Sequence, residues 1–342
     1  MKSFTRRSCN NRRIALLYAV GVILVLSSAI LGLMLGSARI ELRELIGAIT
    51  GADRDGTAAR IFLYVRLPRV AASLLCGAAL AVSGAVIQGV LANKLASPSI
   101  IGVNSGAGLA VTLCAAFGIY GGWQLSLFSF AGALCAVLLV SVGARKWGAS
   151  RSTVILMGVA LNSLLGAISD TVITFDTDAG VMSNDFKIGD FSFVTYSRLA
   201  PAALIILITL ILLFTLSNEL EVLTLGDENA KGLGLDAGRM RVLFLIFAAL
   251  LASSAVSLAG LISFVGLIVP HAVRRLARGA GRHLMPLCAL IGAGFVTLCD
   301  TVARTVFSPY ELPVGIIMAL LGAPFFVFIL IKGKGGHSRD KT

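Results

Sequence analysis

The sequence predicts an all-α, polytopic membrane protein with about ten transmembrane helices in one domain over residues 1–342. Hydrophobic residues make up 57% of the chain and charged residues 13%, with a mean hydropathy of +0.92, values outside the range of soluble domains. Apolar runs of about 20 residues, long enough to cross a hydrocarbon core of about 30 Å, recur along the chain. The predicted spans are 14–36, 70–91, 100–119, 125–143, 153–173, 199–217, 242–260, 261–276, 284–303 and 312–331.

The second span gives the clearest signal for a helix inside a bundle. It carries no charge, yet it contains small and polar residues that let neighbouring helices approach closely and form hydrogen bonds. These residues are Gly77, Ser83, Gly84, Gln88 and Gly89. Pro98 then breaks the helix, and non-helical backbone at membrane depth is tolerated only where protein or a watery cavity satisfies it. We expect this break beside a passage for solute, with an ordinary short loop as the alternative.

The remaining segments are assigned in chain order. The span 14–36 follows five basic residues and is too long for the core of a signal peptide. Residues 37–69 place apolar side chains at roughly helical spacing, which predicts a short amphipathic helix on the membrane surface. Residues 174–198 are an acid-rich outer segment, and residues 218–241 are the longest polar loop on the other side. The span 261–276 is interrupted by a glycine and a proline.

Positive charge predicts the topology. With both tails and the loops 92–99, 144–152, 218–241 and 273–283 in the cytoplasm, 20 of the 29 Lys and Arg residues lie on that side. This agrees with the positive-inside rule and predicts that both termini are cytoplasmic. The same loops account for the net charge of +12, so nucleic acid is rejected as a partner.

No motif for covalent chemistry is present. The sequence has no GxxxxGK[ST], so it has no P-loop of its own for ATP, and it has neither HExxH nor a recognisable Ser-His-Asp set. The six cysteines form no CxxC, and the three histidines have no partner at ligand spacing. We therefore predict no catalytic residue, no metal site and no cofactor.

Three arginines, Arg66, Arg69 and Arg304, are predicted on the outer side, against the positive-inside bias. A guanidinium makes bidentate contacts with carboxylates, so these residues suit the docking of an acidic partner. Two alternatives remain open: they bind lipid phosphates, or they pair with the chain's own acids.

On the inner side, residues 225–234 predict a short exposed helix ended by glycine, with Asp227 and Glu228 in its first turn. Such a helix either contacts a cytoplasmic partner or is a capped helix that contacts nothing.

A proton-coupled carrier working alone is the rival function from another class. Asp170 and Asp300 are its candidate relays, because carboxylates within membrane spans are functional candidates by default. Both lie near the outer ends of their spans. We expect them to be solvated there, which weakens this interpretation.

Several spaced blocks resemble the FecCD family of ABC importer permeases, which carry ferric siderophores, haem and cobalamin. The blocks are RLPR at 66–69, GAALA at 77–81, SG at 83–84, QG at 88–89, LGDENA at 225–230, AGLISFVGLIVPH at 259–271, ELPVG at 311–315 and GAPFF at 322–326. The resemblance covers nearly the whole chain and includes the vitamin B12 importer permease. It implies a type II ABC importer permease in a bacterial cytoplasmic membrane that moves an iron(III)-siderophore or related metal chelate.

The resemblance also implies partners and site residues. These are a second permease subunit, identical or not, a cytoplasmic ATPase dimer that binds the ATP, and an extracytoplasmic substrate-binding protein. The resemblance assigns docking of the binding protein to Arg66, Arg69 and Arg304. It assigns contact with the ATPase to Asp227, Glu228, Ala230 and Gly234, and it places the inner gate at Ser150, Arg151, Ser152 and Thr153. The sequence at 185–190 departs from the family, whose members usually carry a tryptophan and a Gly-Ser pattern in this outer loop.

Overall fold

A computed structural model describes residues 2–37, 56–146, 151–277 and 281–334, which form helices joined by turns, with no strand among them. The helices are α1 (Lys2–Met34), α3 (Thr57–Ile61), the π-helical η1 (Phe62–Arg66), α4 (Leu67–Val90), η2 (Pro98–Ile101), α5 (Val103–Ala116), α6 (Gly122–Lys146), α7 (Arg151–Phe175), α8 (Thr177–Ile188), α9 (Tyr196–Thr215), α10 (Ser217–Thr224), α11 (Asp227–Gly232), α12 (Ala237–Ala259), α13 (Val265–Leu276), η3 (Gly281–His283), α14 (Leu284–Thr305) and α15 (Val314–Lys334).

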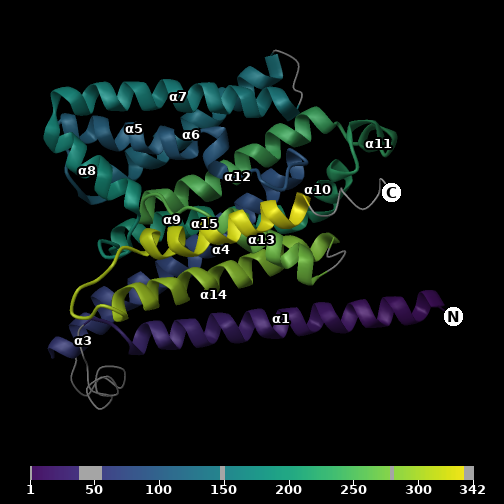
Figure 1. Ribbon diagram of the computed structural model, residues 1–342, viewed down its shortest axis with the longest axis horizontal. Coiled ribbons are helices and arrows are strands. Elements are labelled where there is room, and N and C mark those ends of the chain that lie inside the picture. Colours follow the sequence, from purple (N-terminus) through teal and green to yellow (C-terminus); the bar gives the residue numbers. More distant parts are fainter. Residues whose placement is uncertain (1, 38–55, 147–150, 278–280, 335–342) are drawn as a thin grey trace.

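The long helices run side by side along the long axis of the molecule (Figure 1). Helix α1 forms one side of the bundle and packs on α14, α7 forms the opposite side, and α4 lies between them against α14, α12 and α13. The start of α1, the end of α15, α10 and α11 lie at one end of the bundle, whereas α3 and α8 lie towards the other (Figure 1). By the predicted topology, the first of these is the inner end.

Among the described residues, seven helices are long and apolar enough to cross a membrane, and α5 and α15 supply two shorter apolar helices. The all-α, multi-span fold is therefore as predicted. Two predicted spans are shorter than expected: α5, in the span 100–119, has 14 residues, and α13, in the span 261–276, has 12 residues and is about 18 Å long, too short to cross by itself. Gly260 and Phe264 adopt positive φ angles just before it, so the chain turns there before the helix begins.

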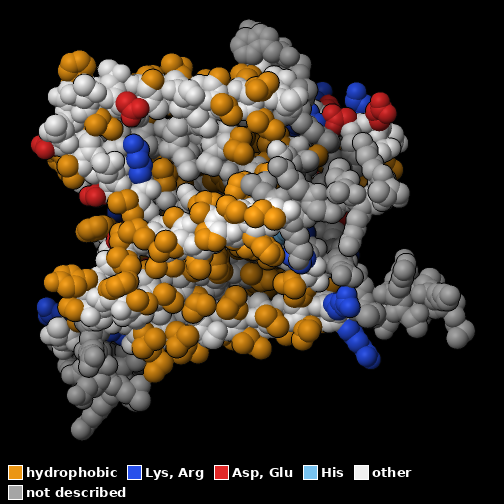
Figure 2. Space-filling view, viewed as in Figure 1, with side chains coloured by type: hydrophobic (Ala, Val, Ile, Leu, Met, Phe, Trp, Pro, Cys, Tyr) orange, Lys and Arg blue, Asp and Glu red, His pale blue; other side chains and the backbone are white. Residues whose placement is uncertain are grey.

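Burial separates the central helices from the outer ones. Of the 18 consecutive residues with the highest hydropathy, 83% are buried inside the chain in the helix that contains α4, compared with 17% in α1 and in α7. Hydrophobic side chains cover the middle of the face shown in Figure 2, and the charged side chains visible there lie towards the two ends. This is the distribution that a lipid belt around the middle requires.

Glycines bring the central helices into backbone contact. A Cβ added at Gly77 would lie 2.3 Å from the Gly292 carbonyl oxygen of α14, and one at Gly84 would lie 2.0 Å from the Gly266 oxygen of α13. Ser83 donates to the Ala248 carbonyl at 2.7 Å. The prediction that α4 lies inside a bundle, packed through small residues, is confirmed.

Two segments differ from their predicted form. The outer segment 174–198 contains α8, whose first turn is capped by the Asp176 carboxylate accepting from two backbone N–H groups. Of the surface helix predicted over 37–69, residues 38–55 lie outside the described residues, and residues 57–66 are helical and continuous with α4.

Candidate translocation pathway and partner contacts

An ionic cluster around Arg69 ties several segments together at the outer end. The Arg69 guanidinium makes a bidentate contact with Asp300 of α14, with Nη2 at 2.9 Å from Oδ1 and Nε at 3.1 Å from Oδ2. Its Nη1 donates to Glu311, just before α15, at 2.6 Å, and Asp190 lies 3.7 Å from Nη2. The side chains of Arg69 and Asp300 are 4% and 0% exposed. Asp300 is therefore not solvated, contrary to expectation.

Arg66 and Arg304 are also buried. Arg66 donates to the carbonyls of Leu33 and Met34 at the end of α1, and Arg304 donates to the Gly32 carbonyl at 2.5 Å. Arg69 pairs with acids of its own chain, which is one of the two alternatives left open by the sequence. A carboxylate on a docking partner would have to displace Glu311 to reach Arg69, so the docking role of the three arginines stays a prediction.

Glu311 is the most accessible acid that contacts Arg69 closely, with 30% of its side chain exposed. Burial by itself would raise the pKa of Glu311, but the hydrogen bond from Ser37 at 2.5 Å and the charge of Arg69 outweigh burial. The pKa of Glu311 therefore lies below its ordinary value.

The segment around residues 186–190, where the sequence departs from the FecCD pattern, joins three elements. Asp190 N–H donates to the Ala259 carbonyl at 2.8 Å, and Leu261 N–H donates to Phe186 at 3.0 Å. Gly315 N–H, in the first turn of α15, donates to the Gly189 carbonyl at 3.1 Å. Beside this junction lies a cavity of about 620 Å³ whose wall includes Tyr120, Asp185, Phe193 and Arg198.

The break after α4 lies beside a second cavity, of about 280 Å³. Leu95, Ser97 and Ser99 line one side, and the irregular segment containing Ser263 and Phe264 lines the other. Two stretches of non-helical backbone thus meet next to a cavity at the middle of the bundle, as the sequence led us to expect. Passage of a solute through it remains a prediction.

Helix α7 exposes small and polar side chains along one face. These residues are Ser163, Ala167, Asp170, Thr171 and Thr174. On its other side α7 is tied to the break by Asn162, which donates to the Ser99 carbonyl at 3.0 Å. The hydroxyls of Ser163, Thr171 and Thr174 donate to carbonyls of the same helix, so they are satisfied even against lipid. The exposed carboxylate of Asp170 is not, so this end of the face suits water or another protein.

The predicted inner gate is only partly visible. Ser150 lies outside the described residues, Arg151 is the first residue of α7, Ser152 is exposed and Thr153 is half-buried. These positions are at the inner end of the helix with the exposed polar face. Their role as a gate remains a prediction.

The predicted inner helix is present as α11 and has Asp227 and Glu228 in its first turn. Arg241 of α12 anchors it through Asp227 at 2.7 Å, and Glu228 is exposed. Gly234 has a φ of +82°, which ends the turn in the left-handed region. Ala230 is fully buried, so it positions the helix and offers no surface to a partner.

Comparison with known proteins decides the family. A family model described as the FecCD transport family matches residues 22–332. This chain belongs to the FecCD family. The FecCD permease is similar to the ABC transporter permease protein YvrB of Bacillus subtilis, at 39% identity over 98% of this chain and 99% of the relative.

Two relatives with named cargo are the Fe(3+)-citrate import permease YfmE of Bacillus subtilis and the cobalamin import permease BtuC of Halobacterium salinarum. YfmE is 34% identical over 96% of this chain and 98% of its own length, and BtuC is 40% identical over 80% and 74%. An inward-facing structure of a metal-chelate type ABC transporter matches with a TM-score of 0.82 and 30% identity, covering 93% of this chain and 99% of that one. The fold is therefore that of a type II ABC importer permease.

Sequence reasoning missed several features of this FecCD permease. The Arg69–Asp300 contact joins residues far apart in the chain, and neither residue's neighbours signal it. The roles of Glu311 and Asp190 in the same cluster were also missed, although both lie in outer segments rich in polar residues. Among the described residues, no group of three or more His, Cys, Asp and Glu side chains is placed to hold a metal ion.

Proposed function

We propose that this permease carries an iron(III)-siderophore or related metal chelate inward across a bacterial cytoplasmic membrane, with both termini cytoplasmic. The FecCD family and the metal-chelate type of the matching structure support this cargo class. Haem and cobalamin remain alternatives within the family, because a relative of similar identity imports cobalamin. A carrier powered by protons through Asp300 is disfavoured, since Asp300 is held by Arg69.

The observation that carries the proposal is the exposed polar face of α7. The hydroxyls of Ser163 and Thr174 are bonded to carbonyls of their own helix, so the exposed carboxylate of Asp170 is the group on this face that favours water or a second protein beside it. We propose that two permease subunits, identical or not, enclose the pathway along this face. The cavity of about 280 Å³ beside the break lies on the other side of the same helix, next to residues to which α7 is bonded.

Filling this face should block transport. Ala167→Phe places a large ring on the exposed polar side of α7 and should lower chelate uptake at least about tenfold, without loss of the protein from the membrane. The matched control is Leu207→Phe on the exposed apolar side of α9, which should transport normally because it faces lipid. Equal uptake by the two variants would remove α7 from the pathway.

ATP hydrolysis is assigned to a separate cytoplasmic ATPase dimer that contacts α11. The exposed carboxylate of Glu228 and the anchoring of α11 by Arg241 support this contact. Glu228→Arg should abolish co-purification with the ATPase while the fold survives. The matched control, Asp178→Arg at the exposed outer start of α8, should retain the ATPase; retention by both variants would reject α11 as the contact.

An extracytoplasmic substrate-binding protein delivers the chelate to the outer end, where the Arg69 cluster and the cavity of about 620 Å³ lie. Because Arg69 is already paired, we propose that the acidic partner reaches it by displacing the accessible Glu311.

A further inference from the structure

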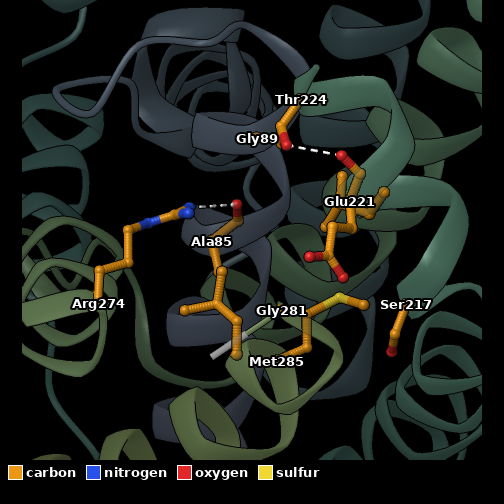
Figure 3. A pocket seen from close by; sticks show the side chains of 10 residues that line it. Ala85, Gly89, Ser217, Glu221, Thr224, Arg274, Gly281 and Met285 are labelled. Carbon is orange, nitrogen blue, oxygen red and sulfur yellow. Dashed lines mark hydrogen bonds between the residues drawn. The ribbon is translucent and has the colours of Figure 1, made fainter. Parts of the chain in front are cut away.

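A separate cavity, of about 210 Å³, lies at the inner end where several helices stop (Figure 3). Gly89 is one residue from the end of α4, Arg274 is in the last turn of α13, and Ser217 is the first residue of α10, just after the end of α9. Gly281 and Leu284 mark the start of α14. The ends of spans define the level of lipid headgroups, so the cavity is at that level.

Arg274 provides the positive wall. Its guanidinium points into the centre of the view, where Nη2 donates to the Ala85 carbonyl at 3.3 Å (Figure 3). The Nε atom is buried and has no hydrogen-bond partner. The described residues give Arg274 no ion pair. Arg274 itself is half-buried, and an anion would satisfy the buried Nε–H that the chain leaves unused.

Glu221 of α10 provides the opposite wall. Its carboxylate points towards Gly281 and Met285, away from Arg274 (Figure 3). Its oxygens lie 2.8 and 3.0 Å from where a Cβ at Gly281 would be, so the carboxylate lies directly against Gly281. Within the described chain Glu221 also has no ion pair. Opposite charges thus face one cavity from two sides without meeting.

This arrangement suits a ligand that carries an oxyanion and a primary ammonium a few ångströms apart. Leu220, Leu284 and Met285 supply an apolar wall between the charges. We propose that the cavity binds the headgroup of phosphatidylethanolamine from the inner leaflet, with the phosphate on Arg274 and the ammonium on Glu221. Arginine matches phosphate geometry, and the ammonium donates to a carboxylate in a way that a quaternary choline cannot. The assignment does not depend on the cargo.

Binding of short-chain lipids to the purified full chain in detergent tests this proposal without any transport step. Dioctanoyl phosphatidylethanolamine should bind about tenfold more tightly than dioctanoyl phosphatidylcholine, because one charge-assisted hydrogen bond is lost with choline. Glu221→Gln should bind the two lipids alike. Arg274→Gln should bind neither lipid, and Arg274→Lys should bind both more weakly. Arg275 is an exposed neighbour on the same helix, so Arg275→Gln should bind as the wild type does.

Four outcomes would overturn the proposal, the last of them the effect of the ATPase. The first is equal binding of the two lipids by the wild-type chain. The second is that the Glu221→Gln and Arg274→Gln variants keep the preference for phosphatidylethanolamine over phosphatidylcholine while eluting as the wild type does, which shows that they are folded. The third is soluble phosphoethanolamine binding as tightly as the lipid, which would assign the cavity to a free small zwitterion. Complete loss of lipid binding on adding the ATPase would instead assign the cavity to that protein contact.

Discussion

The charged side chains at the two ends of the permease differ in burial and in pairing. At the outer end, Arg69 makes close contacts with both Asp300 and Glu311, so the cluster is complete within one chain. At the inner end, Arg274 has an unused donor, Glu221 has no ion pair in the described chain, and Glu228 of α11 is exposed. The comparison indicates that the Arg69–Asp300 contact holds the outer end of the fold together, whereas the inner charges leave donors and acceptors unused within the described chain.

Asp300→Ala should lower the free energy of unfolding more than any other change proposed here. It leaves the guanidinium of Arg69 buried without its bidentate partner, and breaking a buried pair from one side costs about 3–5 kcal/mol. The free energy of unfolding of the purified permease, from denaturant titration in detergent, measures the loss. A cost below about 1 kcal/mol, the value typical of surface pairs, would mean that the outer cluster is not structural.

Glu311→Gln is the control within the same cluster, with an expected cost of about 1 kcal/mol because Glu311 is partly exposed and Arg69 keeps Asp300. The pKa of Glu311 is lowered in the folded chain, so its contribution is present above the ordinary glutamate pKa and is lost as the pH falls through the lowered value. The variant should therefore differ from wild type at neutral pH and converge with it in acid.

Arg274→Met should have the smallest effect on stability. The substitution removes a guanidinium that has no ion pair among the described residues and replaces it with an apolar chain of similar length, which is often neutral or stabilising. In lipid-free detergent we expect a change within about 1 kcal/mol, by the same denaturant titration. A cost as large as that of Asp300→Ala would abolish the distinction between the two ends.

Much of the fold follows from local patterns. The apolar runs predict most long helices to within a few residues, as the comparison of 70–91 with α4 (Leu67–Val90) illustrates. Small residues correctly predict that α4 is central, because glycine at helical spacing has no other use in an apolar run. Helix α8 was missed because its acids indicated a polar segment, although Asp176 is a cap of the kind that starts helices.

The candidate sites were less predictable because their contacts are not local. The sequence places Arg69 and Asp300 at the outer side, but no periodicity reports that one side chain binds the other across α4 and α14. The position of α11 and its two acids follows from its glycines and charges, whereas the burial of Ala230 depends on packing that one sequence does not record. The Arg274 cavity is formed by four separate segments and has no sequence signature.

The central claim is that this chain is a pathway with no energy source of its own. The most direct measurement reconstitutes it in vesicles, with and without its ATPase partner, and follows accumulation of a ferric siderophore supplied with the binding protein. We expect accumulation only when the ATPase and ATP are both present. Accumulation by the permease alone, driven by a pH gradient, would contradict it.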